Sequence, residues 1–253
     1  MREVAELVVA PSEAGIASAL GPRFLEDLSR LVRRAPAGRR VDVGLSGGFI
    51  TRRLLPGLVG PSAVDWSRVR VWMVDERYVA AGDPSRNDDE AWAGFLRHCP
   101  GVELVRAPTA DQYGPDGLEK AGAAFARTWE RLMGAHSFDT ALIGMGPDGH
   151  ICSLFPHHRA LDSPGPVVRV PDSPKPPPQR ITVSMAVMRS CRNVWLAAPG
   201  AANPPRATRF STPRAPPSSP GASRPPRSAA WPAPRGWTRR WSPTTSAPRA
   251  TCS

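Results

Sequence analysis

Residues 138–156 read Phe-Asp-Thr-Ala-Leu-Ile-Gly-Met-Gly-Pro-Asp-Gly-His-Ile-Cys-Ser-Leu-Phe-Pro. The apolar run at 140–143 is typical of a buried strand, and it leads into a glycine-rich turn that ends on His150. Glycine lets a backbone approach a ligand closely, and histidine exchanges protons near neutral pH. The stretch therefore predicts a buried strand followed by an active-site turn.

The glycines at 144, 146 and 149 also satisfy the dinucleotide-binding pattern G-x-G-x-x-G. That fold needs a full helix and then a second parallel strand, a crossover of about a dozen residues or more. Here residues 150–155 allow only about one and a half helical turns before Pro156, and the next strand-like run begins at Val167. The spacing argues against a dinucleotide cofactor. A tight turn with a surface histidine is the other alternative, and it leaves the placement of His150 unexplained.

Strand and helix patterns alternate over the first 200 residues. The predicted strands are 5–9, 41–45, 69–74, 140–143, 167–170, 181–184 and 194–198, and the predicted helices are 11–32, 51–58, 88–97 and 115–133. The pair Gly21–Pro22 leaves a break in the first helix open. Such alternation predicts a Rossmann-like three-layer α/β sandwich, in which helices cover both faces of a mostly parallel sheet.

The net charge of +11 belongs mainly to the end of the chain. Residues 201–253 contain nine Arg and twelve Pro but no Asp, Glu, Leu, Ile, Val or Met. The rest carries 24 basic against 22 acidic residues, so it is nearly neutral. A segment without aliphatic residues cannot build a core. We therefore expect an α/β domain at 1–203 and a disordered Pro/Arg-rich tail at 204–253.

The four cysteines, at 99, 152, 191 and 252, show no C-x-x-C pairing, which favours reduced thiols over a metal site. No stretch reaches the eighteen or so apolar residues of a membrane helix. The first residues lack the basic-then-apolar layout of a signal peptide. These features favour a cytoplasmic protein that contacts no membrane.

Three further segments belong to one pattern together with the glycine-rich turn that ends on His150. They are Leu45-Ser-Gly-Gly48, Val74-Asp-Glu-Arg77 with Asn87 ten residues on, and Arg180-Ile-Thr-Val183 leading to Val194-Trp-Leu-Ala-Ala-Pro-Gly200. Taken in order, the four segments resemble the 6-phosphogluconolactonase family. The resemblance implies a hydrolase of carbohydrate metabolism that converts 6-phospho-D-glucono-1,5-lactone to 6-phosphogluconate in the pentose phosphate pathway. It implies a sugar-phosphate lactone as the partner, with no cofactor and no metal.

The polar motifs follow directly after predicted strands, so they meet at one edge of the sheet, where ligands bind. The backbone N–H groups of Ser46, Gly47 and Gly48 suit a phosphate, although an ordinary tight connection is an equal alternative. By resemblance Arg77 points into the site and binds phosphate or stabilises an oxyanion. Its triplet could also be a charged loop. Asn87 resembles a polar substrate contact of the family, and a turn-forming asparagine is the alternative.

Lactone hydrolysis needs a positioned water, a base and oxyanion donors. His150 suits the base, and Asp148 would orient the imidazole or the sugar. The N–H groups of the turn from Gly146 to Gly149 are candidate oxyanion donors. Ser153 follows His150 too closely for a Ser-His-Asp hydrolase, and no G-x-S-x-G elbow is present.

Two alternative functions remain open. The related glucosamine-6-phosphate deaminases typically carry Asp-Glu-Tyr and Phe-Asn-Glu-Pro, where this chain has residues 75–77 as Asp-Glu-Arg and 153–156 as Ser-Leu-Phe-Pro. A non-enzymatic protein that binds nucleic acid through the basic tail is the other alternative. Phe49 departs from the family's usual Ser or Thr, which puts one hydroxyl contact in doubt, although Thr51 or Arg52 could partly substitute.

The tail departs from the family. The resemblance implies a lysine shortly after Gly200, then a helix and a final strand and helix, and none of these appears. Asn203 stands near the expected lysine, and Asn and Lys codons share their first two bases. We therefore expect a change of reading frame at about residue 203, with a genuine basic arm as the alternative. Resequencing of the coding DNA and the mass of the protein decide between them.

Overall fold

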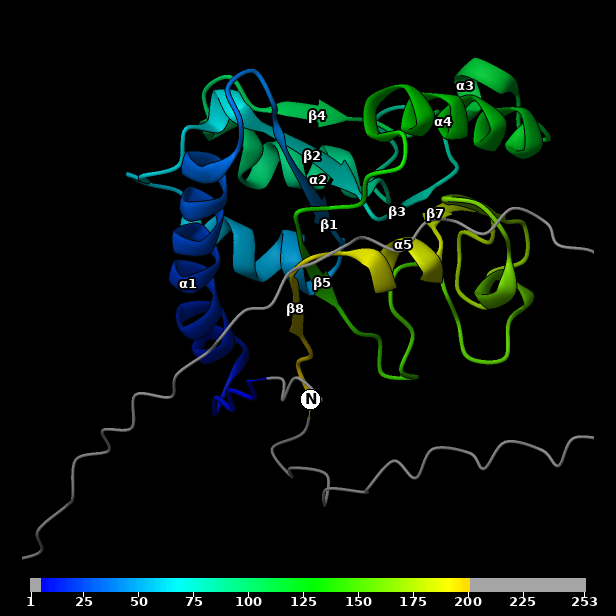
Figure 1. Cartoon of the computed structure of the whole chain (residues 1–253). Coiled ribbons are helices and arrows are strands. Elements are labelled where there is room, and N and C mark those ends of the chain that lie inside the picture. Colours follow the sequence, from blue (N-terminus) through cyan, green and yellow to red (C-terminus); the bar gives the residue numbers. More distant parts are fainter. Residues whose placement is uncertain (1–5, 201–253) are drawn as a thin grey trace, which may run out of the picture. The chain divides into compact units, whose positions relative to one another are not determined.

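Five parallel strands form the central sheet, in the order β4-β2-β1-β5-β8 (Figure 1). Their bounds are Val41–Leu45 for β1, Val69–Met73 for β2, Glu103–Val105 for β4, Thr140–Gly144 for β5 and Val194–Ala197 for β8. The computed structural model describes residues 6–200, which belong to a unit spanning residues 1–204. Strand β1 is buried along its whole length and β2 at every position except Arg70, as expected for central strands that are covered on both faces.

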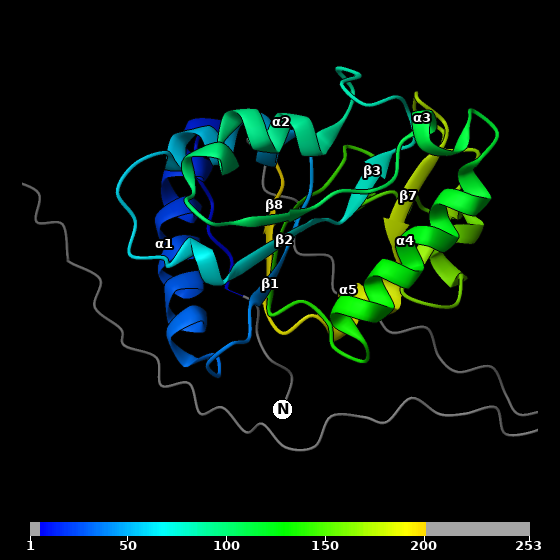
Figure 2. The ribbon, with the colours of Figure 1, turned by 90° about the horizontal axis from the view of Figure 1, so that it is seen from above.

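Helices α1 (Glu13–Arg34) and α2 (Asn87–Gly94) cover one face of this sheet (Figure 2). Between them lie a π-helix at Ile50–Leu54 and a 3-10 helix at Leu55–Leu58. The hydroxyl of Ser12 accepts a hydrogen bond from the backbone N–H of Gly15 and begins α1, as its sequence predicts. Alternate strand residues meet helical residues in this core. Its members include Val43, Leu45, Val71 and Leu142 from the strands and Phe24, Leu28 and Leu54 from the helices.

The opposite face is covered by α4 (Leu118–Met133), α5 (Met185–Ser190) and a second, smaller sheet. Indole and phenyl rings fill this second core, with Trp72 packed against Trp129 at 5.2 Å between ring centroids. Helices therefore lie on both faces of a mostly parallel sheet, and the Rossmann-like α/β prediction is confirmed.

The second sheet has three antiparallel strands in the order β3-β7-β6, at Asp75–Arg77, Arg180–Val183 and Val167–Val170. Val74 joins it to the central sheet. The N–H of Val74 donates to the carbonyl of Leu45, and its own carbonyl accepts from the N–H of Val183. The triplet at 75–77 is therefore a strand, and its interpretation as a charged loop is wrong.

Several local predictions differ from the structure. Residues 6–9 are not a strand, and the side chains of Leu7 and Val9 are exposed to solvent. Helix α1 runs unbroken through Pro22. Residues 150–155 form turns and an isolated bridge between Ile151 and Leu154 in place of helical turns. The short elements β4, α5 and α3 (Ala110–Tyr113) were not expected.

The expectations about the end of the chain lie outside the described residues. They comprise the disordered tail at 204–253 and the change of reading frame near Asn203. No helix within residues 6–200 is long and apolar enough to cross a membrane.

Candidate active site

The loops after β1 and β5 lie side by side, because these strands are neighbours in the central sheet. From β1 the chain proceeds to β2 and β4 on one side, whereas β5 and β8 lie on the other. Such a change of direction leaves a crevice outside the strand ends, where doubly wound proteins bind ligands. The hydroxyl of Ser46 accepts a hydrogen bond of 2.7 Å from the N–H of Gly144, which ties the two strand ends together. Loops 46–48 and 145–150 therefore lie next to each other at the place where a ligand crevice is expected.

His150 ends the second loop, with its ring stacked on Phe155 at 4.5 Å between centroids. Its Nδ1 lies 2.5 Å from Oδ1 of Asp148. A Cβ atom on Gly146 would lie 2.0 Å from Cε1 of His150, so only glycine leaves room for the imidazole. Gly149 adopts a φ of +84°, a left-handed conformation that glycine takes without strain. The loop sequence thus fixes the imidazole between a carboxylate and an aromatic ring.

Asp148 is held in its charged form. The hydrogen bond to His150, and next the one from Lys175, hold the pKa of Asp148 well below its ordinary value. Because an ionised carboxylate only accepts hydrogen bonds, Nδ1 of His150 carries the proton that it donates. Nε2 is then the ring nitrogen that can accept a proton from a ligand or a water. The pair has the form of a general base with an orienting carboxylate.

Two backbone N–H groups of the turn that ends on His150 are engaged within the turn. The N–H of Gly146 donates to the carbonyl of His150, and the N–H of Gly149 donates to the carbonyl of Gly146, both at 2.9 Å. These two groups therefore do not point at a ligand. The oxyanion role expected for the turn as a whole stays a prediction.

The loop at 46–48 brings its backbone close to Asn87. A Cβ atom on Gly47 would lie 1.9 Å from Oδ1 of Asn87, whereas a Cβ atom on Gly48 would have no heavy atom within 4 Å. Gly48 has a φ of +68°. Phe49, at the position where the resemblance implies a hydroxyl, is partly buried and packs against the core that contains Phe24 and Leu28. The loop can therefore approach a ligand through its backbone at Gly48.

Asn87 is almost fully buried, at 2% exposure, and its side chain is fixed at one end. Its Nδ2 donates to the carbonyl of Asp75, and its Oδ1 has no partner among the described residues. Glu76 holds the start of α2 in place, because its carboxylate accepts from the N–H groups of Asn87, Asp88 and Arg77. Burial, and then the charge of Asp88, raise the pKa of Glu76 to about 8.

Arg77 keeps part of its guanidinium uncommitted. Its Nη1 donates to the carbonyl of Ser85, whereas its buried Nε has no partner within residues 6–200. An unpaired buried donor is costly unless a ligand or water satisfies it. The guanidinium of Arg77 is therefore chemically suited to bind either a phosphate or an oxyanion.

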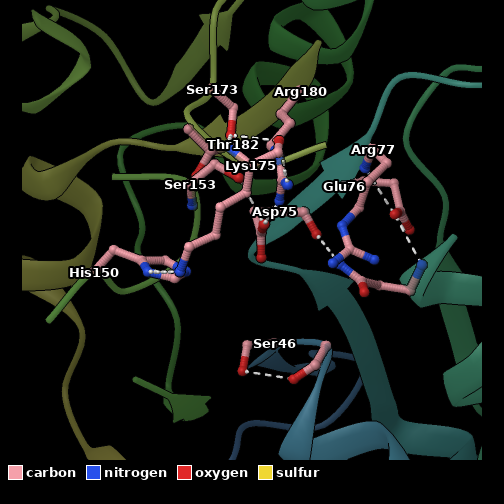
Figure 3. A network of polar contacts seen from close by, with 12 residues as sticks. Ser46, Asp75, Glu76, Arg77, His150, Ser153, Ser173, Lys175, Arg180 and Thr182 are labelled. Atoms are coloured by element: carbon pink, nitrogen blue, oxygen red, sulfur yellow. Dashed lines mark hydrogen bonds and ion pairs between the residues drawn. The ribbon is translucent and has the colours of Figure 1, made fainter. Parts of the chain in front are cut away.

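Sequence reasoning missed a cluster of polar residues beside His150 (Figure 3). Lys175 extends toward His150 from the segment between β6 and β7, with Nζ 2.9 Å from Oδ1 of Asp148. A lysine among prolines resembles a linker, and the only available signal was its rarity, since the chain has two lysines. The buried members of the cluster are Asp75, Ser153, Arg180 and Thr182.

These residues connect the two loops through direct contacts. Gly47 abuts Asn87, which bonds to Asp75. The carboxylate of Asp75 accepts a hydrogen bond of 2.7 Å from Ser153 and lies 3.9 Å from Arg180. Arg180 in turn binds the backbone that carries Lys175. The structure therefore brings Ser46, Gly47, Gly48, Asn87, Asp148 and His150 to one edge of the fold, and Arg77 follows Asp75 on the connecting strand.

The strand order defines a doubly wound α/β protein, a class that binds its ligands at the switch point of the sheet. Residues 11–230 match the family of glucosamine-6-phosphate isomerases/6-phosphogluconolactonase. The chain belongs to this family. The match continues past residue 203 into the Pro/Arg-rich segment.

Similar proteins carry related names. The chain is 36% identical over 213 residues to a 6-phosphogluconolactonase of Streptomyces coelicolor, covering 79% of this chain and 80% of that one. It is 38% identical over 189 residues to a 6-phosphogluconolactonase of Mycobacterium leprae, covering 69% and 74%. A crystal structure of 6-phosphogluconolactonase from Leishmania guyanensis has a TM-score of 0.63 at 21% identity, over 76% and 80% of the two chains, and supports the fold alone.

Metal-binding side chains do not cluster in the described part of the chain. Within residues 6–200, no group of three or more His, Cys, Asp or Glu residues is placed to hold a metal ion. Cys99, Cys152 and Cys191 are free thiols.

Proposed function

We propose that this protein hydrolyses 6-phospho-D-glucono-1,5-lactone to 6-phosphogluconate. The observation that carries the proposal is the His150–Asp148 pair at the switch-point crevice, with Nε2 left as a proton acceptor. Relatives with 36% and 38% identity that are named 6-phosphogluconolactonase support the same reaction.

In the proposed mechanism, His150 takes a proton from a water that attacks C1 of the lactone. Asp148 stabilises the imidazolium that forms, because it already accepts the Nδ1–H bond. The bond between C1 and the ring oxygen then breaks, and the protonated imidazole returns the proton to that oxygen. A lactone is an activated ester, so one base and one charge-stabilising group suffice.

The phosphate would bind at the other loop of the crevice. The backbone at Gly48 faces open space, and the uncommitted Nε of Arg77 supplies a charged donor. The unpartnered Oδ1 of Asn87 is an acceptor, so it suits a sugar hydroxyl better than a phosphate. Ser46 would position the loop and not donate to the phosphate, since its N–H donates to the carbonyl of Leu142 and its hydroxyl accepts from the N–H of Gly144.

The test is hydrolysis of freshly prepared lactone by the purified full chain. His150→Ala is expected to lower the turnover rate by about 10²- to 10⁴-fold, as general-base loss does, with little change in KM. His136→Ala is the matched control, because His136 is exposed after α4 and should leave the rate unchanged. Release of ammonia from glucosamine 6-phosphate without lactone hydrolysis would assign the related deaminase reaction instead.

A comparison with unphosphorylated gluconolactone provides a second test of the proposed function. Binding energy from a remote phosphate helps to position the reacting carbonyl, so the unphosphorylated lactone should react much more slowly. Equal rates with both lactones would remove the phosphate site at residues 46–48.

A further inference from the structure

Lys175 lies inside the candidate site although no sequence motif pointed to it. Its Nζ is 2.9 Å from Oδ1 of Asp148 and 3.2 Å from Nδ1 of His150. The ammonium group also lies 5.8 Å from the centroid of the Phe155 ring, on which His150 stacks. The side chain is 37% exposed, so a ligand in the crevice can reach it.

The backbone that carries Lys175 is fixed by a buried cation. Arg180 donates to the carbonyls of Lys175, Pro176 and Pro177, at 3.1 to 3.2 Å. Arg180 is only 4% exposed. Ser173 adds a hydrogen bond from the N–H of Lys175 to its hydroxyl. The main chain is therefore rigid at this point, whereas the four-carbon side chain of Lys175 can exchange partners.

Asp148 and Lys175 carry opposite charges beside His150, and these two charges balance. Asp148 shares one oxygen between the imidazole and the ammonium, so its negative charge offsets that of Lys175. An anion that arrives at His150 competes with Asp148 for the ammonium. The N–H groups of Gly146 and Gly149 cannot serve this anion, because both donate within the turn. Lys175 is the cationic side chain in direct contact with His150 among the described residues.

We propose that Lys175 binds the oxygen atoms that become the product carboxylate. This inference rests on the proposed lactone hydrolysis. When the oxygen of water bonds to C1, the carbonyl electron pair moves to the carbonyl oxygen, and Lys175 donates to that oxyanion. As the ring C–O bond breaks, the pair returns to form the carboxylic acid, and the ring oxygen takes the proton from His150. The acid then ionises to solvent, and Lys175 holds the carboxylate until the product leaves.

The experiment compares two ligands that differ only at C1. Glucitol 6-phosphate has a hydroxymethyl group where 6-phosphogluconate has a carboxylate, and both carry the same phosphate. Affinities of the full chain for each are measured by titration calorimetry. Lys175→Met should weaken 6-phosphogluconate binding by about 10- to 100-fold, as loss of a charge-assisted hydrogen bond does, and leave glucitol 6-phosphate within about twofold. Lys175→Arg should restore most of the affinity.

Lys120→Met is the matched control, because Lys120 is the other lysine of the chain and is exposed on α4. Unchanged glucitol 6-phosphate binding also shows that Lys175→Met is folded. An equal loss for both ligands would overturn the proposal and assign Lys175 to the phosphate, and no loss for either would overturn it as well. If the unmodified protein binds neither ligand, the proposed function itself fails, together with this inference.

Discussion

At position 146 the imidazole of His150 occupies the space that any side chain would need. Gly146→Ala is therefore expected to push the ring away from Asp148 and to lower turnover about 100-fold, although it removes no reacting group. Turnover and thermal unfolding are measured together. Gly57→Ala is the control, since a Cβ atom there meets nothing within 4 Å. Full activity in Gly146→Ala would mean that the observed position of His150 is not required.

Glu76 is expected to make stability depend on pH in a direction that is unusual for a carboxylate. Burial, and then Asp88, raise the pKa of Glu76 from 4.5 to about 8 in the folded protein. Between these values the folded state keeps a proton that the unfolded state has lost. The contribution of Glu76 to stability is therefore complete below pH 4.5 and is lost as the pH rises to 8, by at most about 1.4 kcal/mol per pH unit.

The measurement for Glu76 is urea unfolding from pH 5 to 8. The free energy of unfolding of the unmodified protein should fall with pH relative to that of Glu76→Gln, which cannot titrate. Glu26→Gln, at an exposed position of α1, should follow the unmodified protein. Parallel curves for the unmodified protein and Glu76→Gln would contradict the assignment.

At the scale of elements, strand β7 holds the segment before it through one side chain. Arg180→Met removes three hydrogen bonds to the carbonyls at 175–177 and leaves the buried carboxylate of Asp75 without its nearby cation. We expect the free energy of unfolding to fall by about 3 kcal/mol and amide exchange at 173–178 to accelerate. Arg189→Met, exposed on α5, serves as the control. Unchanged exchange at 173–178 would show that Arg180 does not fix this segment.

Elements with strong local signals were predictable from the sequence. The apolar runs of β1, β2, β5 and β8 and the amphipathic pattern of α4 form where expected. Residues 6–9 show the limit of this reasoning, because an apolar run becomes a strand only where another strand offers hydrogen bonds. Asp75–Arg77 shows the converse, since a charged triplet becomes a strand by pairing with Arg180–Thr182, far away in the sequence.

The part of the candidate site around His150 was predictable, because a glycine-rich motif leads directly to this histidine. Glycines beside His150 indicate a close approach, and the structure shows that the ring of His150 fills the space over Gly146. Lys175 was not predictable, because its approach to His150 depends on the folded path of the segment between β6 and β7, which the buried guanidinium of Arg180 holds in place. The hydrogen bonds that the N–H groups of Gly146 and Gly149 donate within the turn were not predictable either, because they depend on the backbone conformation of the loop.

At the scale of the whole molecule, β8 is an edge strand of the described sheet with apolar side chains in solvent. Val194 is 48% exposed and Leu196 is 49% exposed. Exposed edges of this kind pair with other chains. We expect concentration-dependent self-association in light scattering, which the double substitution Val194→Lys and Leu196→Lys should reduce. Val59→Lys, at a site 45% exposed away from the strand, should not. Equal association in all three proteins would contradict this role of β8.

The junction at Val74 links the two segments that are proposed to bind the substrate. One residue bonds to Leu45, just before the loop proposed for the phosphate, and to Val183, on the strand whose Arg180 fixes Lys175. In the proposed function, main-chain bonds through this residue help to set the distance between the phosphate and the reacting carbonyl. A phosphorylated lactone one carbon shorter is then expected to fit the two loops less well. Discrimination by chain length would depend on the backbone as well as on the side chains of Arg77 and Lys175.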